Sequence, residues 1–174
     1  FSIYPGSRLS EINILTPILF EFVKKMNEKH KDLFFVFHST AEHVHLIQNL
    51  LLKEGLKNCG AIGDEKIKAH VLQSSIFAVA KSGTISLEIC NAKIPSIIIY
   101  KMGFLNFLIV KNLVKTKYAN IINFAANEEI IPELLQSNCN SKNIFKYVDN
   151  FLEQPNKIKK KIEKVQKILK KFKT

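Results

Sequence analysis

The sequence predicts a doubly wound α/β fold, in which helices cover both faces of one parallel β-sheet. Two observations carry this prediction. Short runs of consecutive apolar residues, such as "LFFVF" and "PSIIIY", have the length and continuity of strands that are buried on both faces. Longer segments between them repeat apolar residues every three to four positions, which is typical of amphipathic helices. The 174 residues suffice for one domain with a buried core.

Strands and helices are expected to alternate through the first two thirds of the chain. The strands are expected at the apolar runs Phe1–Tyr4, Leu33–Ser39, Cys59–Ile62, Ser75–Ala80 and Pro95–Tyr100. The helices are expected at Glu11–Lys29, Ala41–Gly55, Asp64–Leu72, Thr84–Lys93 and Phe104–Val114. Asp64 is a suitable N-cap for the third of these helices, and Gly55 is a suitable C-cap for the second.

The last third of the chain has a helical pattern throughout. Helices are expected at "EEIIPELLQ" (Glu128–Gln136), at "NIFKYVDNFLEQ" (Asn143–Gln154) and in the tail. We therefore divide the chain into a Rossmann-like domain over residues 1–154 and a basic amphipathic C-terminal helix over residues 155–174.

The positive charge of the chain is concentrated in this tail. The tail carries nine lysines and one glutamate, while the net charge of the whole chain is +11. A nearly balanced domain argues against a nucleic-acid-binding core. The tail also has an apolar stripe, which leaves two readings open. The stripe packs against the domain or a partner, or the helix lies on an anionic lipid surface.

No residue pattern indicates a metal site. The three cysteines are widely spaced, and His43 and His45 lie two residues apart, so they point to different faces of the expected helix. The sequence also contains no Walker A motif and no G-x-G-x-x-G motif, which argues against an ATPase or a dehydrogenase.

Two short loops carry the candidate binding residues. "YPGSR" (Tyr4–Arg8) and "AKSGTISLE" (Ala80–Glu88) each lead from an expected strand into an expected helix. Ligands bind beyond the carboxyl ends of the strands in a doubly wound sheet, where both loops are expected to lie. Small residues there let backbone N–H groups approach an anion, and hydroxyl and guanidinium groups add donors. These residues are Gly6, Ser7, Arg8, Ser82, Gly83 and Thr84.

Glu88 lies one helical turn beyond Thr84 and suits sugar hydroxyls better than phosphate. Together the loops predict a nucleotide site, with a diphosphate at Ser82–Thr84, a ribose at Glu88 and Arg8 reaching in from the neighbouring loop. Taken alone, a Ser-Gly-Thr turn is a weak signal, because such turns cap helices in many proteins.

Five motifs in order resemble the lipid-A-disaccharide synthase family. They are "PGSR" followed by Glu11, "AKSGTISLE", a proline and strand ending in "YK", "LVKTKYANIINF" and "EEIIPELLQ". The resemblance runs from Tyr4 to about Gln136. It implies the C-terminal, donor-binding half of a GT-B glycosyltransferase that moves a diacylglucosamine from UDP to a diacylglucosamine 1-phosphate. The product is the β-1,6-linked lipid A disaccharide, and the reaction inverts the anomeric centre.

The resemblance also implies roles for single residues. Arg8 is expected to neutralise the diphosphate as UDP leaves, and is the catalytic candidate. Gly6, Ser7, Ser82, Gly83 and Thr84 are expected to hold the diphosphate, and Glu88 the ribose. Asn120 and Asn123 are expected in the segment that lines the cleft, with Asn123 contacting the donor. No metal and no cofactor besides the UDP-diacylglucosamine donor are expected.

Further expectations concern the rest of the protein. The sequence starts inside an expected strand, so we expect an acceptor-binding N-terminal domain before it, without which the chain binds UDP but does not turn over. The lipid donor and acceptor imply a peripheral protein on the cytoplasmic face of the bacterial inner membrane. A homodimer is left open, and no nucleic acid is expected. Two alternatives remain, a UDP-binding or membrane-docking module without catalysis and another GT-B enzyme such as a UDP-sugar epimerase.

Overall fold

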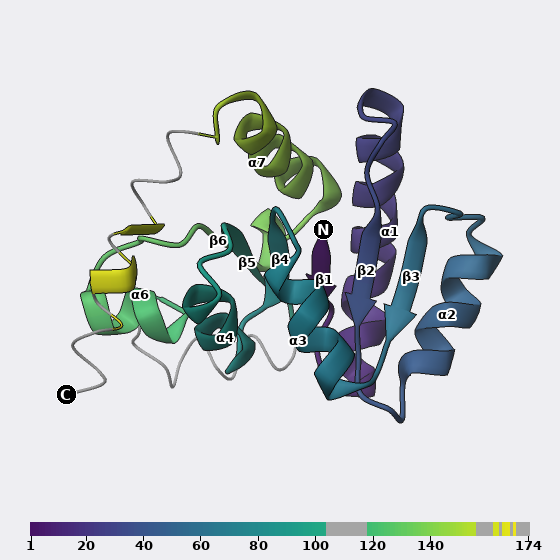
Figure 1. Cartoon of the computed structure of the whole chain (residues 1–174), viewed down its shortest axis with the longest axis horizontal. Helices are drawn as coiled ribbons and strands as arrows, with labels where there is room; N and C mark the ends of the chain where they lie inside the picture. The colour runs from purple at the N-terminus through teal and green to yellow at the C-terminus, as the bar shows by residue number, and fades with distance from the viewer. Residues whose placement is uncertain (104–117, 156–161, 164, 168, 170–174) are drawn as a thin grey trace.

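The computed structural model describes residues 1–103, 118–155, 162–163, 165–167 and 169. Within them one six-stranded sheet has the order β3-β2-β1-β4-β5-β6, and every pair of neighbouring strands is parallel (Figure 1). The strands are β1 (Ser2–Tyr4), β2 (Phe35–His38), β3 (Cys59–Ile62), β4 (Ala78–Lys81), β5 (Ser96–Tyr100) and β6 (Glu133–Leu135). The order reverses between β1 and β4, as in a doubly wound fold. The predicted fold class is confirmed.

The helices lie on both faces of this sheet (Figure 1). They are α1 (Leu9–Lys29), α2 (Val44–Lys53), α3 (Glu65–Gln73), α4 (Ile85–Asn91), α6 (Ile121–Ala126) and α7 (Ser141–Glu153), with a short 3-10 helix, η1 (Gln136–Asn138), after β6. The expected caps are present. Asp64 accepts a hydrogen bond from the N–H of Ile67 at 3.0 Å, and Gly55 has a φ of +67° just after α2.

Two hydrophobic clusters form the core, one on each face. Alternating residues of β5 belong to different clusters. Ile97 and Ile99 belong to the cluster that also contains residues of α1, α2 and α7, whereas Ile98 belongs to the one with residues of α3, α4 and α6. All three isoleucines are fully buried. The continuous apolar runs in the sequence thus have the expected cause, which is burial of the sheet on both faces.

Part of the described tail packs on the second cluster. Val165 and Leu169 are buried there, and the side-chain amide of Gln166 donates a hydrogen bond to the backbone oxygen of Cys90. These tail residues are helical. Their packing favours the first of the two readings of the apolar stripe, in which it covers the domain.

The last third of the chain contains a strand where a helix is expected. The helix expected at Glu128–Gln136 is wrong, because Glu133–Leu135 forms strand β6, which pairs with β5. Pro132 explains the difference, since proline disfavours a helical conformation in the residue before it and has no N–H to donate. Its oxygen instead accepts a hydrogen bond from the N–H of Ile98 at 2.9 Å. The helix expected at Phe104–Val114 lies outside the described residues.

Candidate functional site

A cavity of about 310 Å³ lies at the carboxyl ends of β1, β2 and β4. Its walls come from the β1–α1 loop, the end of β2, helix α3 and the β4–α4 loop. Six of the eight predicted site residues line it, namely Gly6, Ser7, Ser82, Gly83, Thr84 and Glu88. The structure therefore brings the two predicted loops together at the edge of the sheet where ligands of doubly wound folds bind.

Glu11 and Lys81 join the two loops. The carboxylate of Glu11 accepts hydrogen bonds from the N–H groups of Ser7 at 3.2 Å and Arg8 at 3.4 Å, and thereby caps α1. Lys81, at the end of β4, lies 2.9 Å from the same carboxylate. Burial alone would raise the pKa of Glu11, but Lys81 and the two N–H groups outweigh burial and hold this pKa below its ordinary value.

Gly6 is required by this cap. Its φ is +113°, and a Cβ atom at this position would lie 2.4 Å from Oε2 of Glu11. At Gly83 the nearest atom to such a Cβ would be the Lys81 oxygen at 4.0 Å. The protein itself therefore needs a glycine at position 6, whereas the space at position 83 is open towards the cavity.

The Ser-Gly-Thr turn offers fewer donors than its sequence indicates. Ser82 uses both its N–H, on the oxygen of Ile99, and its hydroxyl, on the oxygen of Ala119. In contrast, the N–H groups of Gly83 and Thr84 make no hydrogen bond with another described residue, and the Thr84 hydroxyl makes no capping bond to α4. The free donors of this turn thus belong to Gly83 and Thr84.

Arg8 stands beside the cavity and is absent from the described residues that line it. It is the N-cap residue of α1, its side chain is 80% exposed, and its Nη1 atom lies 3.8 Å from Oε1 of Glu11. A pair this exposed is weak, so the guanidinium is available to an anion at the mouth of the cavity.

Asn120 and Asn123 lie outside the cavity walls in the described part of the chain. Asn120 caps α6. Asn123 is fully buried; its Oδ1 atom accepts hydrogen bonds from the N–H groups of Ile130 and Ile131, and its amide donates to the Ile131 oxygen and to Glu133. The whole side chain of Asn123 is thus engaged in holding the segment that leads into β6.

The sequence reasoning missed several residues of the cavity wall. His38, Ser39 and Thr40, at and just after the end of β2, line the cavity together with Tyr4 from β1. The Tyr4 and His38 rings stack with their centroids 4.1 Å apart. The only sequence signal was their place after a strand, at the same edge as the two loops.

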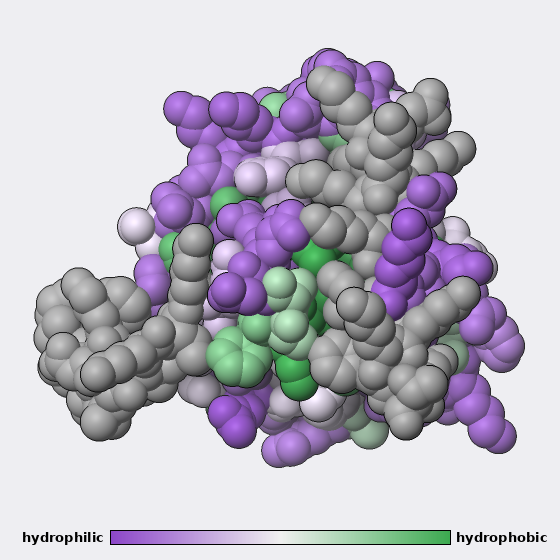
Figure 2. Space-filling view, turned by 90° about the vertical axis from the view of Figure 1, so that its left-hand side faces the viewer, coloured by the Kyte–Doolittle hydropathy of each residue, from purple (hydrophilic) through white to green (hydrophobic). Residues whose placement is uncertain are grey.

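The described residues present two further surfaces. A cavity of about 200 Å³ lies beside the amino ends of β5 and β6, where Pro95 and Pro132 line it, and so at the opposite edge of the sheet. On α6 the side chains of Ile121 and Phe124 are exposed. Figure 2 shows hydrophobic surface gathered on the side of the molecule that carries this helix.

The same residues contain neither a metal-binding cluster nor a helix that could span a membrane. No group of three or more His, Cys, Asp or Glu side chains could hold a metal ion. None of the described helices combines the length and the apolar character that a membrane crossing requires.

Comparison with known proteins identifies the family. The family model described as lipid-A-disaccharide synthetase matches residues 1–174. The lipid-A-disaccharide synthase of Rickettsia bellii (strain OSU 85-389) is 34% identical over 166 residues, which cover 94% of this chain and 42% of that protein. The synthase of Persephonella marina (strain DSM 14350 / EX-H1) is 34% identical over 177 residues, covering 97% and 46%.

A solved structure supports the fold. The pneumococcal O-GlcNAc transferase GtfA, crystallised in complex with UDP and GlcNAc, superposes on 99% of this chain and 34% of its own with a TM-score of 0.53 and 15% identity. The chain spans less than half the length of the curated relatives described above. On the match to its whole length and the identity to these relatives, the chain belongs to the lipid-A-disaccharide synthetase family.

Proposed function

We propose that this chain is the donor-binding part of a lipid-A-disaccharide synthase. The whole enzyme would transfer a diacylglucosamine from UDP to a diacylglucosamine 1-phosphate, with inversion, to form the β-1,6-linked disaccharide and release UDP. Family membership supports the reaction. The observation that carries the site is the meeting of Gly6–Ser7, Ser82–Thr84 and Glu88 on one cavity at the carboxyl edge of the sheet.

The diphosphate is assigned to the space between the two loops. The unused N–H groups of Gly83 and Thr84 are donors for phosphate oxygens there. The open space at Gly83 supports this assignment, because no described residue occupies the place of its missing Cβ. The first turn of α1 begins at the same edge and contributes its positive dipole potential.

Two cations are close enough to act on the charge that develops as UDP leaves. The exposed guanidinium of Arg8 can pair with phosphate oxygens in a bidentate manner. Lys81 lies on the cavity wall and is held in place by Glu11. Preorganised donors of this kind stabilise a departing diphosphate, so the proposed reaction needs no metal ion.

The ribose is assigned to Glu88. Its carboxylate lies on the cavity wall, and no hydrogen bond or ion pair with another described residue engages it. An unengaged carboxylate accepts hydrogen bonds from a pair of sugar hydroxyls, whereas it would repel a diphosphate.

The acceptor and the base that takes its proton are assigned to parts of the enzyme beyond this chain. We place the whole protein at the cytoplasmic face of the bacterial inner membrane, where both lipid substrates would be accessible. Nine tail lysines would attract anionic lipid there, each contributing about 1 kcal/mol close to the surface.

The alternatives are a UDP-sugar epimerase and a UDP-binding or membrane-docking module without catalysis. A UDP-sugar epimerase is disfavoured, because the synthetase family model matches the whole chain. A UDP-binding module without catalysis would have the same cavity. It differs from the proposed function in that the complete protein would bind UDP without forming a disaccharide.

The proposal is tested by calorimetric titration of the chain with UDP. We expect weak binding that Arg8→Ala and Glu88→Ala each reduce at least fivefold. Lys53→Ala and Glu21→Gln serve as controls, because both side chains are exposed and lie away from the cavity. A folded chain that does not bind UDP would refute the site.

The membrane proposal has its own test. Sedimentation with anionic and with zwitterionic vesicles is compared for the wild type and for a variant with Lys159, Lys160 and Lys161 changed to glutamine. The substitutions leave the buried Val165 and Leu169 intact. Weaker binding of the variant to anionic vesicles supports the proposal, and equal binding contradicts it.

A further inference from the structure

Three residues of the cavity wall each have a polar side-chain atom that finds no hydrogen-bond partner among the described residues. These atoms are Nδ1 of His38, the hydroxyl of Ser39 and the hydroxyl of Thr40, and all three are buried. His38 is 2% exposed and Ser39 is 4% exposed. Buried polar groups are hydrogen-bonded in most native structures, so three adjacent exceptions in one cavity indicate a place for a polar ligand.

A chain of hydrogen bonds determines which nitrogen of His38 carries the proton. The hydroxyl of Ser75 donates its single proton to the oxygen of Val71 at 2.8 Å. It must therefore accept from the hydroxyl of Ser2, 2.8 Å away. Ser2 has then used its own proton, so it accepts from Nε2–H of His38 at 2.8 Å.

The other nitrogen, Nδ1, is consequently a bare acceptor. Burial, and next the charge of Lys68, lower the pKa of His38 to about 3, so the ring does not take up a second proton near neutral pH. An imidazole in this state requires a donor at Nδ1, an N–H or O–H group supplied from the cavity.

The acceptor is also held firmly in position. The His38 ring stacks on Tyr4. The N–H of Ser39 donates to the Ile62 oxygen at 2.9 Å. Gly63 packs so closely on the next turn that a Cβ there would lie 3.2 Å from Cα of Ala41 and 3.3 Å from the Thr40 oxygen. Because its hydrogen-bonding groups are held in fixed positions, this part of the cavity can select a ligand by the pattern of its donors and acceptors.

We propose that His38, Ser39 and Thr40 recognise the base of the nucleotide. In this arrangement Nδ1 of His38 accepts a hydrogen bond from the N3–H group of uracil. The hydroxyls of Ser39 and Thr40 donate to the carbonyl oxygens on either side of that group. Uracil offers one donor between two acceptors, which matches one bare acceptor and two hydroxyls. The inference rests on the proposed function, since it assumes that the cavity binds a nucleoside diphosphate.

Cytosine is the informative comparison. Its N3 atom has no proton and would face Nδ1 of His38 with a second lone pair. The site is therefore expected to prefer UDP over CDP by at least tenfold, although the two ligands have the same ribose and diphosphate.

The test uses ligands first. Wild-type chain is titrated with UDP, CDP and N3-methyl-UDP, in which a methyl group replaces the N3 proton. We expect both CDP and N3-methyl-UDP to bind at least tenfold more weakly than UDP. Equal binding of UDP and N3-methyl-UDP would overturn the inference and would indicate that water occupies the three polar atoms.

Two variants test the residue itself. In His38→Gln the amide nitrogen takes the place of Nε2 and keeps a donor for Ser2, but no acceptor remains at the place of Nδ1. In His38→Asn the amide oxygen takes the place of Nδ1, and the bond to Ser2 is lost. We expect the preference for UDP over CDP to fall below threefold in His38→Gln and to persist in His38→Asn.

The outcomes separate the inference from the proposed function. If UDP binds and Ser39→Ala and His38→Gln, shown to be folded by circular dichroism, leave the preference unchanged, the inference is wrong and the donor site stands. If UDP does not bind to the wild type at all, the proposed function is wrong, and the inference fails with it.

Discussion

Nζ of Lys81 lies 2.9 Å from Oε1 of Glu11, and this ion pair joins the end of β4 to the first turn of α1. The two residues are far apart in sequence, but Lys81 belongs to one loop of the candidate site and Glu11 lies just after the other. The pair orders both loops before any ligand arrives, and it also neutralises a lysine that faces the proposed diphosphate.

This pair predicts opposite effects on UDP binding for its two members. Glu11→Gln keeps acceptors for the N–H groups of Ser7 and Arg8 but releases the charge of Lys81, so UDP should bind severalfold more tightly. Lys81→Met should weaken binding at least fivefold and should also destabilise the fold by about 1–2 kcal/mol, because Glu11 loses its partner. Calorimetry at low ionic strength and urea unfolding measure the two effects. Weaker binding by Glu11→Gln would contradict the proposed place of the diphosphate.

The two loop glycines should respond differently to the same substitution. Gly6→Ala forces a side chain into a positive φ and against Glu11, so we expect a loss of about 2 kcal/mol or more in unfolding free energy. Gly83→Ala places its methyl group in open space, so stability should change little while UDP affinity falls at least tenfold. The unfolding free energy and the UDP affinity are measured for both variants, so that each variant is the control for the other. Unchanged UDP affinity in Gly83→Ala would show that no ligand approaches this backbone.

His38 should make the fold sensitive to acid. Its pKa is lowered to about 3 in the folded chain, while an unfolded histidine has its ordinary value of 6.5, so the unfolded state binds more protons between these values. Stability is therefore complete above pH 6.5 and falls with decreasing pH by about 1.4 kcal/mol per unit. Urea unfolding at pH 4.5, 5.5 and 7 gives the slope.

The matched variant for this measurement is His38→Gln. Carboxylates such as Glu11 also lose stabilisation in acid, but they do so in both proteins. The change of unfolding free energy with pH should be smaller in the variant by about the contribution of one histidine. Identical slopes in the two proteins would show that His38 is not buried in a neutral state.

Asn123 should be a stability residue. Asn123→Ala would leave the N–H groups of Ile130 and Ile131 without their acceptor, so we expect a loss of about 3 kcal/mol in unfolding free energy. UDP affinity measured below the unfolding temperature should stay within twofold of the wild type. A large loss of affinity in a stable variant would instead support the sequence-based expectation that Asn123 contacts the donor.

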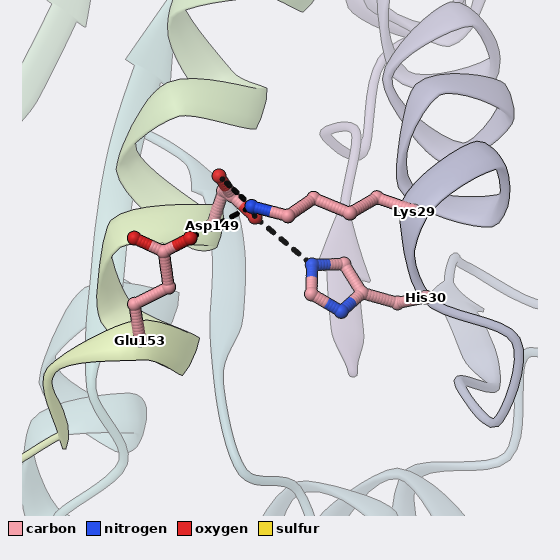
Figure 3. A network of polar contacts seen from close by, with 4 residues as sticks. All are labelled: Lys29, His30, Asp149 and Glu153. Atoms are coloured by element: carbon pink, nitrogen blue, oxygen red, sulfur yellow. Dashed lines mark hydrogen bonds and ion pairs between the residues drawn. The ribbon is translucent and has the colours of Figure 1, made fainter.

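A polar network between α1 and α7 offers a stability change remote from the cavity. Figure 3 shows Lys29 and His30, at the end of α1, facing Asp149 and Glu153 of α7. Nζ of Lys29 lies 2.8 Å from Asp149, and Nε2 of His30 lies 2.9 Å from the same carboxylate. Burial would raise the pKa of Asp149, but these two partners lower it.

Asp149→Asn should therefore lower the urea midpoint at low salt and have a smaller effect in 1 M NaCl, because salt screens an exposed network. UDP affinity should not change. A salt-independent effect would show that the side chain acts through packing, and altered UDP binding would show that the two ends of α1 are coupled.

Part of this structure was predictable from local pattern. β1, β2, β4 and β5 follow from apolar runs, because these strands lie largely buried within the sheet, whereas the edge strand β3 is only half-buried. In α1, apolar residues recur every four positions at Ile14, Ile18, Phe22 and Met26. Phe22 and Met26 are fully buried, but Ile14 and Ile18 are only half-buried, because the buried face also contains Leu15 and Leu19. The periodicity predicts the helix, whereas its packing partners determine which of its faces is buried.

Other features depend on contacts that no local pattern contains. β6 is a strand because β5 supplies its partners, and three residues of "ELL" carry no strand signal of their own. α6 was not expected, although Asn120 at its start and Asn127, with a φ of 50° at its end, are recognisable caps. The state of His38 depends on Ser2 and Ser75, which come from distant parts of the chain.

The most direct test of the proposed donor site is an NMR titration of the ¹⁵N-labelled chain with UDP. We predict the largest shifts at the amides of Gly6, Ser7, Gly83 and Thr84, which line the cavity at the carboxyl edge of the sheet. The amides of Ile94 and Ser96, beside the cavity at the opposite edge, should not move. Shifts confined to that second cavity, or no shifts in a folded chain, would contradict the proposed site.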